Sequence, residues 1–188
     1  PSEFFQTVFF DYLTPGSANG GLSWNGFEHN VLFMNDSGKG FFNGSFLMGS
    51  AFEYDARSVA ADDLNGDGKA DILAVEFQRL KGGRSMTSLH MLENQWRGTN
   101  HWIGVRLQDA PGVSAIGASI VVHTREGKHI ARITNGDSYR AQHANTRLFG
   151  LGAIDKVEAL QVRWQNGEVT EIAHPKADTY HLMAPQSR

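Results

Sequence analysis

The sequence predicts an all-β protein with two β domains. Twenty-one glycines are spread over the 188 residues, so turns interrupt the chain often. The apolar stretches between them are short, and few of them repeat with the period of a helix. The pattern changes at residues 95–100, and we therefore expect one domain over residues 1–95 and a second over residues 96–188.

Short apolar stretches predict the strands of the first domain. Residues 31–34 and 41–42 flank a segment rich in Asn, Asp, Ser and Gly, which predicts a hairpin. Further strands are expected at residues 58–61, 72–75 and 88–92, with a polar and basic exposed excursion over residues 79–87. The segment 4–13 is apolar nearly all round, so it is either a buried strand or a short helix.

Alternating apolar and polar residues predict the strands of the second domain, which suit a small sandwich or barrel. These strands are expected at residues 102–107, 120–123, 130–133, 162–165 and 168–172. The last two flank Asn166-Gly167, a dipeptide favoured in type I′ hairpin turns.

Composition excludes several classes of protein. The formal charge of −3, from 17 basic and 20 acidic residues, argues against nucleic acid as a main partner. The absence of cysteine excludes disulfides, thiolate metal sites and a cysteine nucleophile. No stretch approaches the roughly 20 apolar residues of a transmembrane helix.

The segment "DLNGDGKAD", residues 63–71, carries a concentrated set of oxygen donors. Asp63, Asn65, Asp67 and Asp71 stand at positions 1, 3, 5 and 9, and Lys69 offers its backbone carbonyl at position 7. Calcium takes six to eight such oxygens from a loop wound around a sharp glycine turn. Without a cation the carboxylates would repel one another. The segment therefore predicts a calcium site, with an ion-free cluster of Asx turns as the alternative.

The surroundings of this loop differ from those of an EF-hand. Position 12, which is a bidentate glutamate in an EF-hand, is Ala74 here, and the flanking residues have strand length rather than a helical stripe. We therefore expect strand, calcium loop and strand. Because free calcium is abundant outside the cytosol, an extracytoplasmic location, periplasmic or secreted, is expected.

Catalytic and transition-metal signatures are not found in the sequence. Its eight histidines lack ligand spacing on a helix, no Gly-x-Ser-x-Gly elbow marks a nucleophile, and adjacent carboxylates would point to opposite faces of a strand. A non-enzymatic protein is expected.

Two groups of aromatic residues are candidates for binding. Trp24, Trp96 and Trp102 lie in or beside loops, where an indole either stacks on a sugar or anchors a protein interface, unless it covers the edge of a core. Phe4, Phe5, Phe9 and Phe10 form the most concentrated apolar signal, which either docks into a partner or completes the core.

Longer motifs carry a family resemblance. "EHNVLFMNDSGKGFF" followed by "DLNGDGKADILAV" resembles the FG-GAP or VCBS repeat, the calcium-binding blade of integrin-like propellers. "NHWIGVRLQ", "SAIGASIVV", "GDSYRAQHANTRLFGLG" and "VEALQVRWQNGEV", in that order, resemble the ASPIC/UnbV domain of the cartilage acidic protein-like family. The resemblance implies one or more incomplete propeller-like blades with a calcium loop, then a small β domain.

An unclosed blade exposes hydrogen-bonding edges and an apolar face. We expect this chain to be either the C-terminal piece of a longer propeller protein or a subunit covered by a partner. The predicted function is a non-catalytic, calcium-stabilised interaction or structural module. Two alternatives stay open: a carbohydrate-binding module, and an accessory subunit of a membrane-associated complex that docks through its Phe-rich N-terminus.

Overall fold

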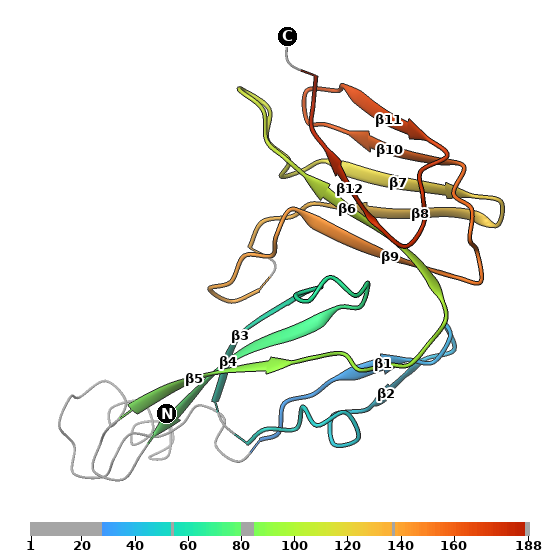
Figure 1. Ribbon diagram of the computed structural model, residues 1–188. Helices are drawn as coiled ribbons and strands as arrows, with labels where there is room; N and C mark the ends of the chain where they lie inside the picture. Colours follow the sequence, from blue (N-terminus) through green and yellow to red (C-terminus); the bar gives the residue numbers. More distant parts are fainter. Residues whose placement is uncertain (1–27, 54, 80–84, 137, 187–188) are drawn as a thin grey trace. The chain divides into compact units, whose positions relative to one another are not determined.

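The computed structural model describes residues 28–186, apart from residues 54, 80–84 and 137. Every regular element in this part of the chain is a β-strand, which confirms the all-β prediction (Figure 1). No helix among the described residues is long and apolar enough to cross a membrane. The strands are β1 (Phe33–Asn35), β2 (Phe41–Asn43), β3 (Asp55–Asp62), β4 (Asp71–Arg79), β5 (Ser85–Leu92), β6 (His101–Leu107), β7 (Ser119–Thr124), β8 (Gly127–Arg132), β9 (Thr146–Gly152), β10 (Ala159–Arg163), β11 (Val169–Ala173) and β12 (Tyr180–Met183).

The chain divides into two compact units. One contains Leu73–Leu92 together with the chain up to Ser58, and the other contains Val59–Ile72 together with Glu93–Arg188. The oxygen-rich loop at residues 63–71 therefore groups with the C-terminal residues.

The first unit contains the predicted hairpin of β1 and β2. Phe33 pairs with Asn43 and Asn35 with Phe41, and the connecting turn places Ser37 and Gly38 at φ of 49° and 79°. The sheet with strand order β3-β4-β5 follows in the sequence.

The predicted excursion over residues 79–87 is wrong in its bounds. β4 continues to Arg79 and β5 begins at Ser85, so that at most residues 80–84, which lie outside the described residues, connect them. Backbone pairing extends the strands beyond their apolar runs because ladder hydrogen bonds do not require apolar side chains.

The second unit contains a β-sandwich. One sheet has the order β11-β10-β7-β8 and the other β12-β6-β9. β12 pairs with β6 in parallel, whereas β10 with β11, β7 with β10, β7 with β8 and β6 with β9 pair antiparallel. Buried residues of both sheets, among them Ile103, Ile120, Phe149 and Leu160, form a single apolar cluster. Both sheets are open, so the fold is a sandwich and not a closed barrel.

The residues that belong to this core alternate along each strand with residues that are partly exposed. Ile120 and Val122 of β7 and Leu160 and Val162 of β10 are fully buried, while the residues between them are partly exposed. Trp164 follows β10 and is 2% exposed, and its indole N–H donates to Thr170 Oγ1 at 2.8 Å. A large aromatic ring with a polar atom is therefore buried with that atom paired.

The predicted hairpin of β10 and β11 is present, but its turn is not type I′. That turn requires positive φ at both central residues, and at Asn166-Gly167 only Gly167 has it, with φ of 85°. Gly167 N donates to Trp164 O at 3.0 Å, and Trp164 N donates to Glu168 O at 2.9 Å. The glycine thus follows the turn as a bulge residue, the usual solution for a loop one residue longer.

Candidate metal centre

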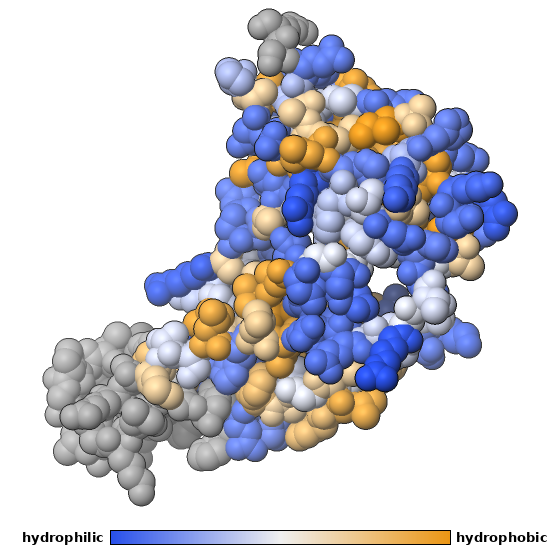
Figure 2. All heavy atoms as spheres, viewed as in Figure 1, coloured by the Kyte–Doolittle hydropathy of each residue, from blue (hydrophilic) through white to orange (hydrophobic). Residues whose placement is uncertain are grey.

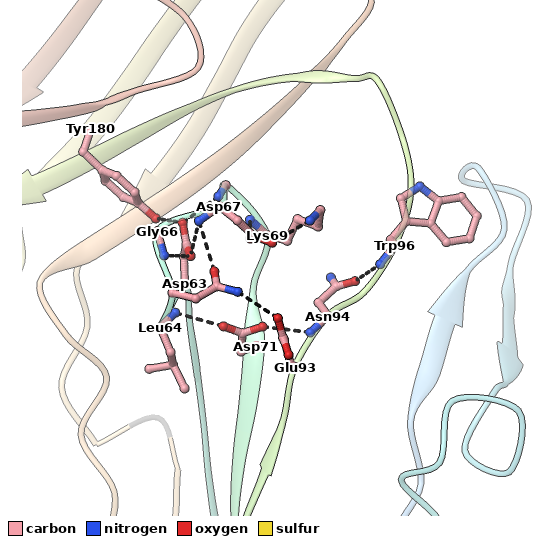
Figure 3. Close-up of polar contacts among 12 residues, drawn as sticks. Asp63, Leu64, Gly66, Asp67, Lys69, Asp71, Glu93, Asn94, Trp96 and Tyr180 are labelled. Atoms are coloured by element: carbon pink, nitrogen blue, oxygen red, sulfur yellow. Dashed lines mark hydrogen bonds and ion pairs between the residues drawn. The ribbon is translucent and has the colours of Figure 1, made fainter.

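The predicted calcium loop connects β3 to β4 as a tightly wound turn (Figure 3). Gly66 and Gly68 have φ of 80° and 83°, which an L side chain adopts only with strain. Gly68 is at position 6 of the loop, where a calcium loop needs its sharp turn. The predicted strand, loop and strand arrangement is confirmed.

Asp63 is the residue around which the loop is wound. Only 6% of it is exposed. Its Oδ1 accepts N–H bonds from Gly66 at 2.7 Å and Asp67 at 3.0 Å, and its Oδ2 accepts one from Gly68 at 2.8 Å. The hydroxyl of Tyr180, on β12, donates to the same Oδ2 at 2.7 Å. Four donors therefore fix this carboxylate.

Asp71 is a second buried carboxylate, with 2% exposed. One oxygen accepts the N–H of Leu64 at 3.0 Å and the other accepts that of Asn94 at 2.8 Å. Two neutral amides meet a buried negative charge, and each carboxylate oxygen keeps a lone pair.

Hydrogen bonds at both the oxygen and the nitrogen of its side-chain amide orient Asn65. Its Oδ1 accepts the N–H of Asp67 at 3.1 Å, and its Nδ2 donates to Glu93 Oε1 at 3.2 Å. Glu93 directly follows β5. Because its carboxylate accepts from the amide nitrogen of Asn65, the amide oxygen is the atom that faces the loop backbone.

Asp67 is paired with the cation of its own loop. Lys69 Nζ lies 2.5 Å from Asp67 Oδ2, and Lys69 N donates to Asp67 Oδ1 at 3.0 Å. The hydrogen bond from the ammonium is the main cause that lowers the pKa of this carboxyl below its ordinary value. Asp67 is therefore ionised at neutral pH, and Lys69 is its partner.

The donor set fits a hard cation. Its side chains offer only oxygens, and two of the carboxylates are buried with neutral donors as partners, which leaves their charges uncompensated. No three acidic or histidine side chains within the described ranges are grouped closely enough to hold a metal by themselves. A cation here would therefore also need Asn65 and the Lys69 carbonyl, as the spacing predicts.

Tyr180 reaches this loop from a packed environment. Its ring lies 5.1 Å from the Trp102 ring, edge to face, and the Arg106 guanidinium lies 4.1 Å from its centroid. Burial is the main cause that raises the pKa of this phenol, followed by the bond to Asp63. The phenol is therefore a stable O–H donor to Asp63.

The predicted binding aromatics lie in different surroundings. Trp96 is 66% exposed, whereas the Trp102 indole packs on the loop, because a Cβ added to Gly68 would lie 2.2 Å from its ring atoms. Trp24 and the candidates Phe4, Phe5, Phe9 and Phe10 lie outside the described residues.

A buried polar cluster lies in the first unit. Glu76 is fully buried and accepts a short hydrogen bond from Asn30 Nδ2. His90 Nε2 lies 3.0 Å from its other oxygen, and the His90 ring stacks on Phe52 with centroids 4.3 Å apart. No sequence pattern predicts this cluster, because Glu76 stands in an otherwise apolar run.

The contact of His90 with Glu76 assigns the two faces of the β4-β5 pair. Alternation then places Leu73, Val75 and Phe77 on the opposite face, together with Leu89 and Met91. Leu89 is 65% and Met91 66% exposed. We call these five residues the apolar sheet face.

More apolar side chains are exposed on and beside the hairpin of the same unit. They are Val31, Phe33, Phe41, Phe42, Phe46, Leu47 and Met48. In the view of Figure 2, apolar residues gather over the region of β1 to β5.

Three residues of the candidate centre escaped prediction from the sequence. Tyr180 is 117 residues from Asp63, and Glu93 and Asn94 lie more than twenty residues beyond the loop. No local pattern marks such partners. The signal in the sequence was that Asp63 and Asp71 stand at the two ends of the loop, next to apolar runs of strand length, and would need donors if buried.

Comparison with known proteins confirms both sequence resemblances. A family model described as FG-GAP repeat matches residues 56–75, which include the loop, and one described as ASPIC and UnbV matches residues 109–188. Cartilage acidic protein 1 from Xenopus tropicalis is 31% identical over 125 residues, 64% of this chain. The proteins of the same name from Mus musculus and Homo sapiens are each 29% identical over 125 residues. The matched part is 18% of the length of each relative.

Proposed function

We propose that this chain, which contains an FG-GAP repeat followed by an ASPIC/UnbV domain, is a non-catalytic, extracytoplasmic β module that docks onto another β-sheet. The observation that carries the proposal is the apolar sheet face. Two of its five members, Leu89 and Met91, are about two-thirds exposed. Burying a side chain of this size stabilises an interface by about 1.5–3 kcal/mol.

The occupant that we propose is a second blade-type sheet with an apolar face of its own. Apolar sheet faces pack on one another about 10 Å apart, and propellers place successive four-stranded blades around a channel. Outside the sandwich, the described residues form a three-stranded sheet and a two-stranded hairpin, which is far from a closed ring of blades. The relatives are long enough to contain several more repeats, since the matched part is 18% of their length.

Calcium is proposed as the stabiliser of the module. Asp63, Asn65, Asp67 and Asp71, with the carbonyl of Lys69, would hold it. A bound cation supplies positive charge that offsets two buried carboxylates, and it would restrain the loop between β3 and β4.

Native mass spectrometry of the protein as isolated from its source tests both parts, because mass reports calcium and partners together. We expect one calcium and a partner that carries FG-GAP-type repeats, identified by peptide sequencing. Leu89→Lys should abolish the association, whereas Ile130→Lys, at a residue 67% exposed in the sandwich, should leave it intact.

Two outcomes would contradict this proposal. A free chain that carries calcium alone would favour the alternative of ligand binding through the exposed indole of Trp96. A partner retained equally by both lysine variants would show that the apolar sheet face is not the docking surface.

A further inference from the structure

We infer that Tyr180 is a positioning residue of the calcium centre, so that the last strand of the ASPIC/UnbV region completes the loop of the FG-GAP repeat. This inference rests on the calcium binding proposed above. It adds a residue that the loop spacing does not predict, from a strand more than a hundred residues further along the chain.

The ring of Tyr180 is held on one face of β6. Trp102, Gly104 and Arg106 alternate along that strand, so their side chains point to the same side. A Cβ at Gly104 would lie 2.2 Å from Tyr180 Cδ1, so the glycine gives the ring its space. The Trp102 ring meets Tyr180 edge to face and the Arg106 guanidinium lies over it. The direction of the hydroxyl is therefore set by packing.

That hydroxyl is aimed at the most extensively bonded oxygen pair of the loop. It lies 2.7 Å from Asp63 Oδ2, whose other donor is Gly68 N (Figure 3). Among the described residues that donate to the Asp63 carboxylate, Tyr180 is the one that does not belong to the loop itself. It therefore ties the orientation of this carboxylate to the sandwich.

Trp102 supports the same loop through an apolar contact. Its indole packs against Gly68, and Trp102 N donates to Asp178 Oδ1 at 3.1 Å, two residues before Tyr180. The loop is therefore contacted by β6 through Trp102 and by β12 through Tyr180.

Hydrogen-bond partners of a ligating carboxylate restrict its orientation before the metal arrives. Removing such a partner typically lowers metal affinity by about 10–100-fold. A residue that only packs would change folding stability and leave the affinity of the folded protein unchanged. Calcium affinity therefore separates positioning from packing.

The test is calorimetric titration of the full chain with calcium chloride. Tyr180→Phe removes the hydroxyl and keeps the ring with its three neighbours, and we expect the dissociation constant to rise about tenfold. Tyr139→Phe is the matched control, since Tyr139 is 60% exposed, and it should bind within about twofold of the unchanged protein. Circular dichroism at the titration temperature verifies that each variant is folded.

The outcomes distinguish the failure of this inference from the failure of the proposed calcium binding on which it rests. If the unchanged chain binds no calcium, the proposed calcium role fails and the inference fails with it. If the unchanged chain binds calcium and Tyr180→Phe binds equally well or more tightly, only the inference is overturned. Should Tyr180→Phe not fold, Arg106→Ala, at an exposed residue, loosens the ring instead; weaker calcium binding then supports the inference, and unchanged binding overturns it.

Discussion

The two units of this chain differ in how far their apolar residues are buried. In the sandwich, seventeen buried residues form one cluster between two sheets. In the first unit, Ala74 is the only buried apolar residue among those that the structure describes, while Leu89, Phe33 and Phe41 are all more than 60% exposed. A domain is stabilised mainly by the apolar surface it removes from water. The sandwich therefore has a core of its own, whereas the sheet with β3 to β5 still has apolar surface to bury.

The strongest test of this difference in burial is to truncate one leucine in each unit. Leu160 is fully buried, so Leu160→Ala should lower the free energy of unfolding by about 3 kcal/mol. Leu89→Ala, at a residue 65% exposed, should change it by less than about 0.5 kcal/mol. Urea unfolding of the two variants measures both values. A comparable loss in both would mean that the chain itself covers the apolar sheet face.

A pair of glycine variants tests whether Trp102 restrains the loop of the candidate centre. Gly66→Ala meets no atom within 4 Å and should cost only the strain of positive φ, about 1–2 kcal/mol. Gly68→Ala also drives its new Cβ into the Trp102 ring, which adds about 1–3 kcal/mol. Thermal unfolding of both variants gives the difference. Equal losses would show that Trp102 does not restrain the loop.

The smallest expected effect is a pH dependence within the sandwich unit. His101 Nδ1 lies 2.7 Å from Asp178 Oδ2, and this hydrogen bond is the main cause that lowers the pKa of Asp178 below its ordinary value of 3.8. A lowered pKa in the folded state stabilises the fold above pH 3.8, and this contribution is lost as the pH falls through the folded-state value. Because both groups are partly exposed, we expect about 0.5 kcal/mol or less.

Unfolding free energies of the unchanged protein and of Asp178→Asn, measured from pH 6 to pH 2.5, check this expectation. The asparagine retains an oxygen for Trp102 N, so the variant isolates the charge. The two curves should converge at the acidic end. Curves that remain parallel throughout would contradict the role of Asp178.

Local patterns predicted most of the strands and the loop, but not what meets the loop. The run at residues 102–107 alternates clearly and became β6, with His101 added. β12 was missed because Tyr180–Met183 has only four residues, too few to show a period. β9 was missed because Gly150 and Gly152 interrupt its apolar residues.

The missed partners of the loop have a common physical cause. Asp63 and Asp71 are recognisable from spacing, because a cation loop draws its donors from consecutive residues. Tyr180 meets Asp63 only because β12 pairs in parallel with β6, a relation that depends on tertiary folding. The buried pair of Glu76 and His90 was not predicted for the same reason, since no local sequence pattern around either residue indicates a partner.

The bond between Tyr180 and Asp63 also has a consequence for the order in which a ribosome-bound chain completes its structure. Domains acquire structure from the N-terminus as synthesis proceeds. The amides of Gly66, Asp67 and Gly68 emerge together with Asp63, so the turn is able to wind early. Its last donor emerges 117 residues later. Between the synthesis of Asp63 and that of Tyr180 the nascent chain therefore has a loop whose first aspartate lacks its final partner, and β12 supplies that partner.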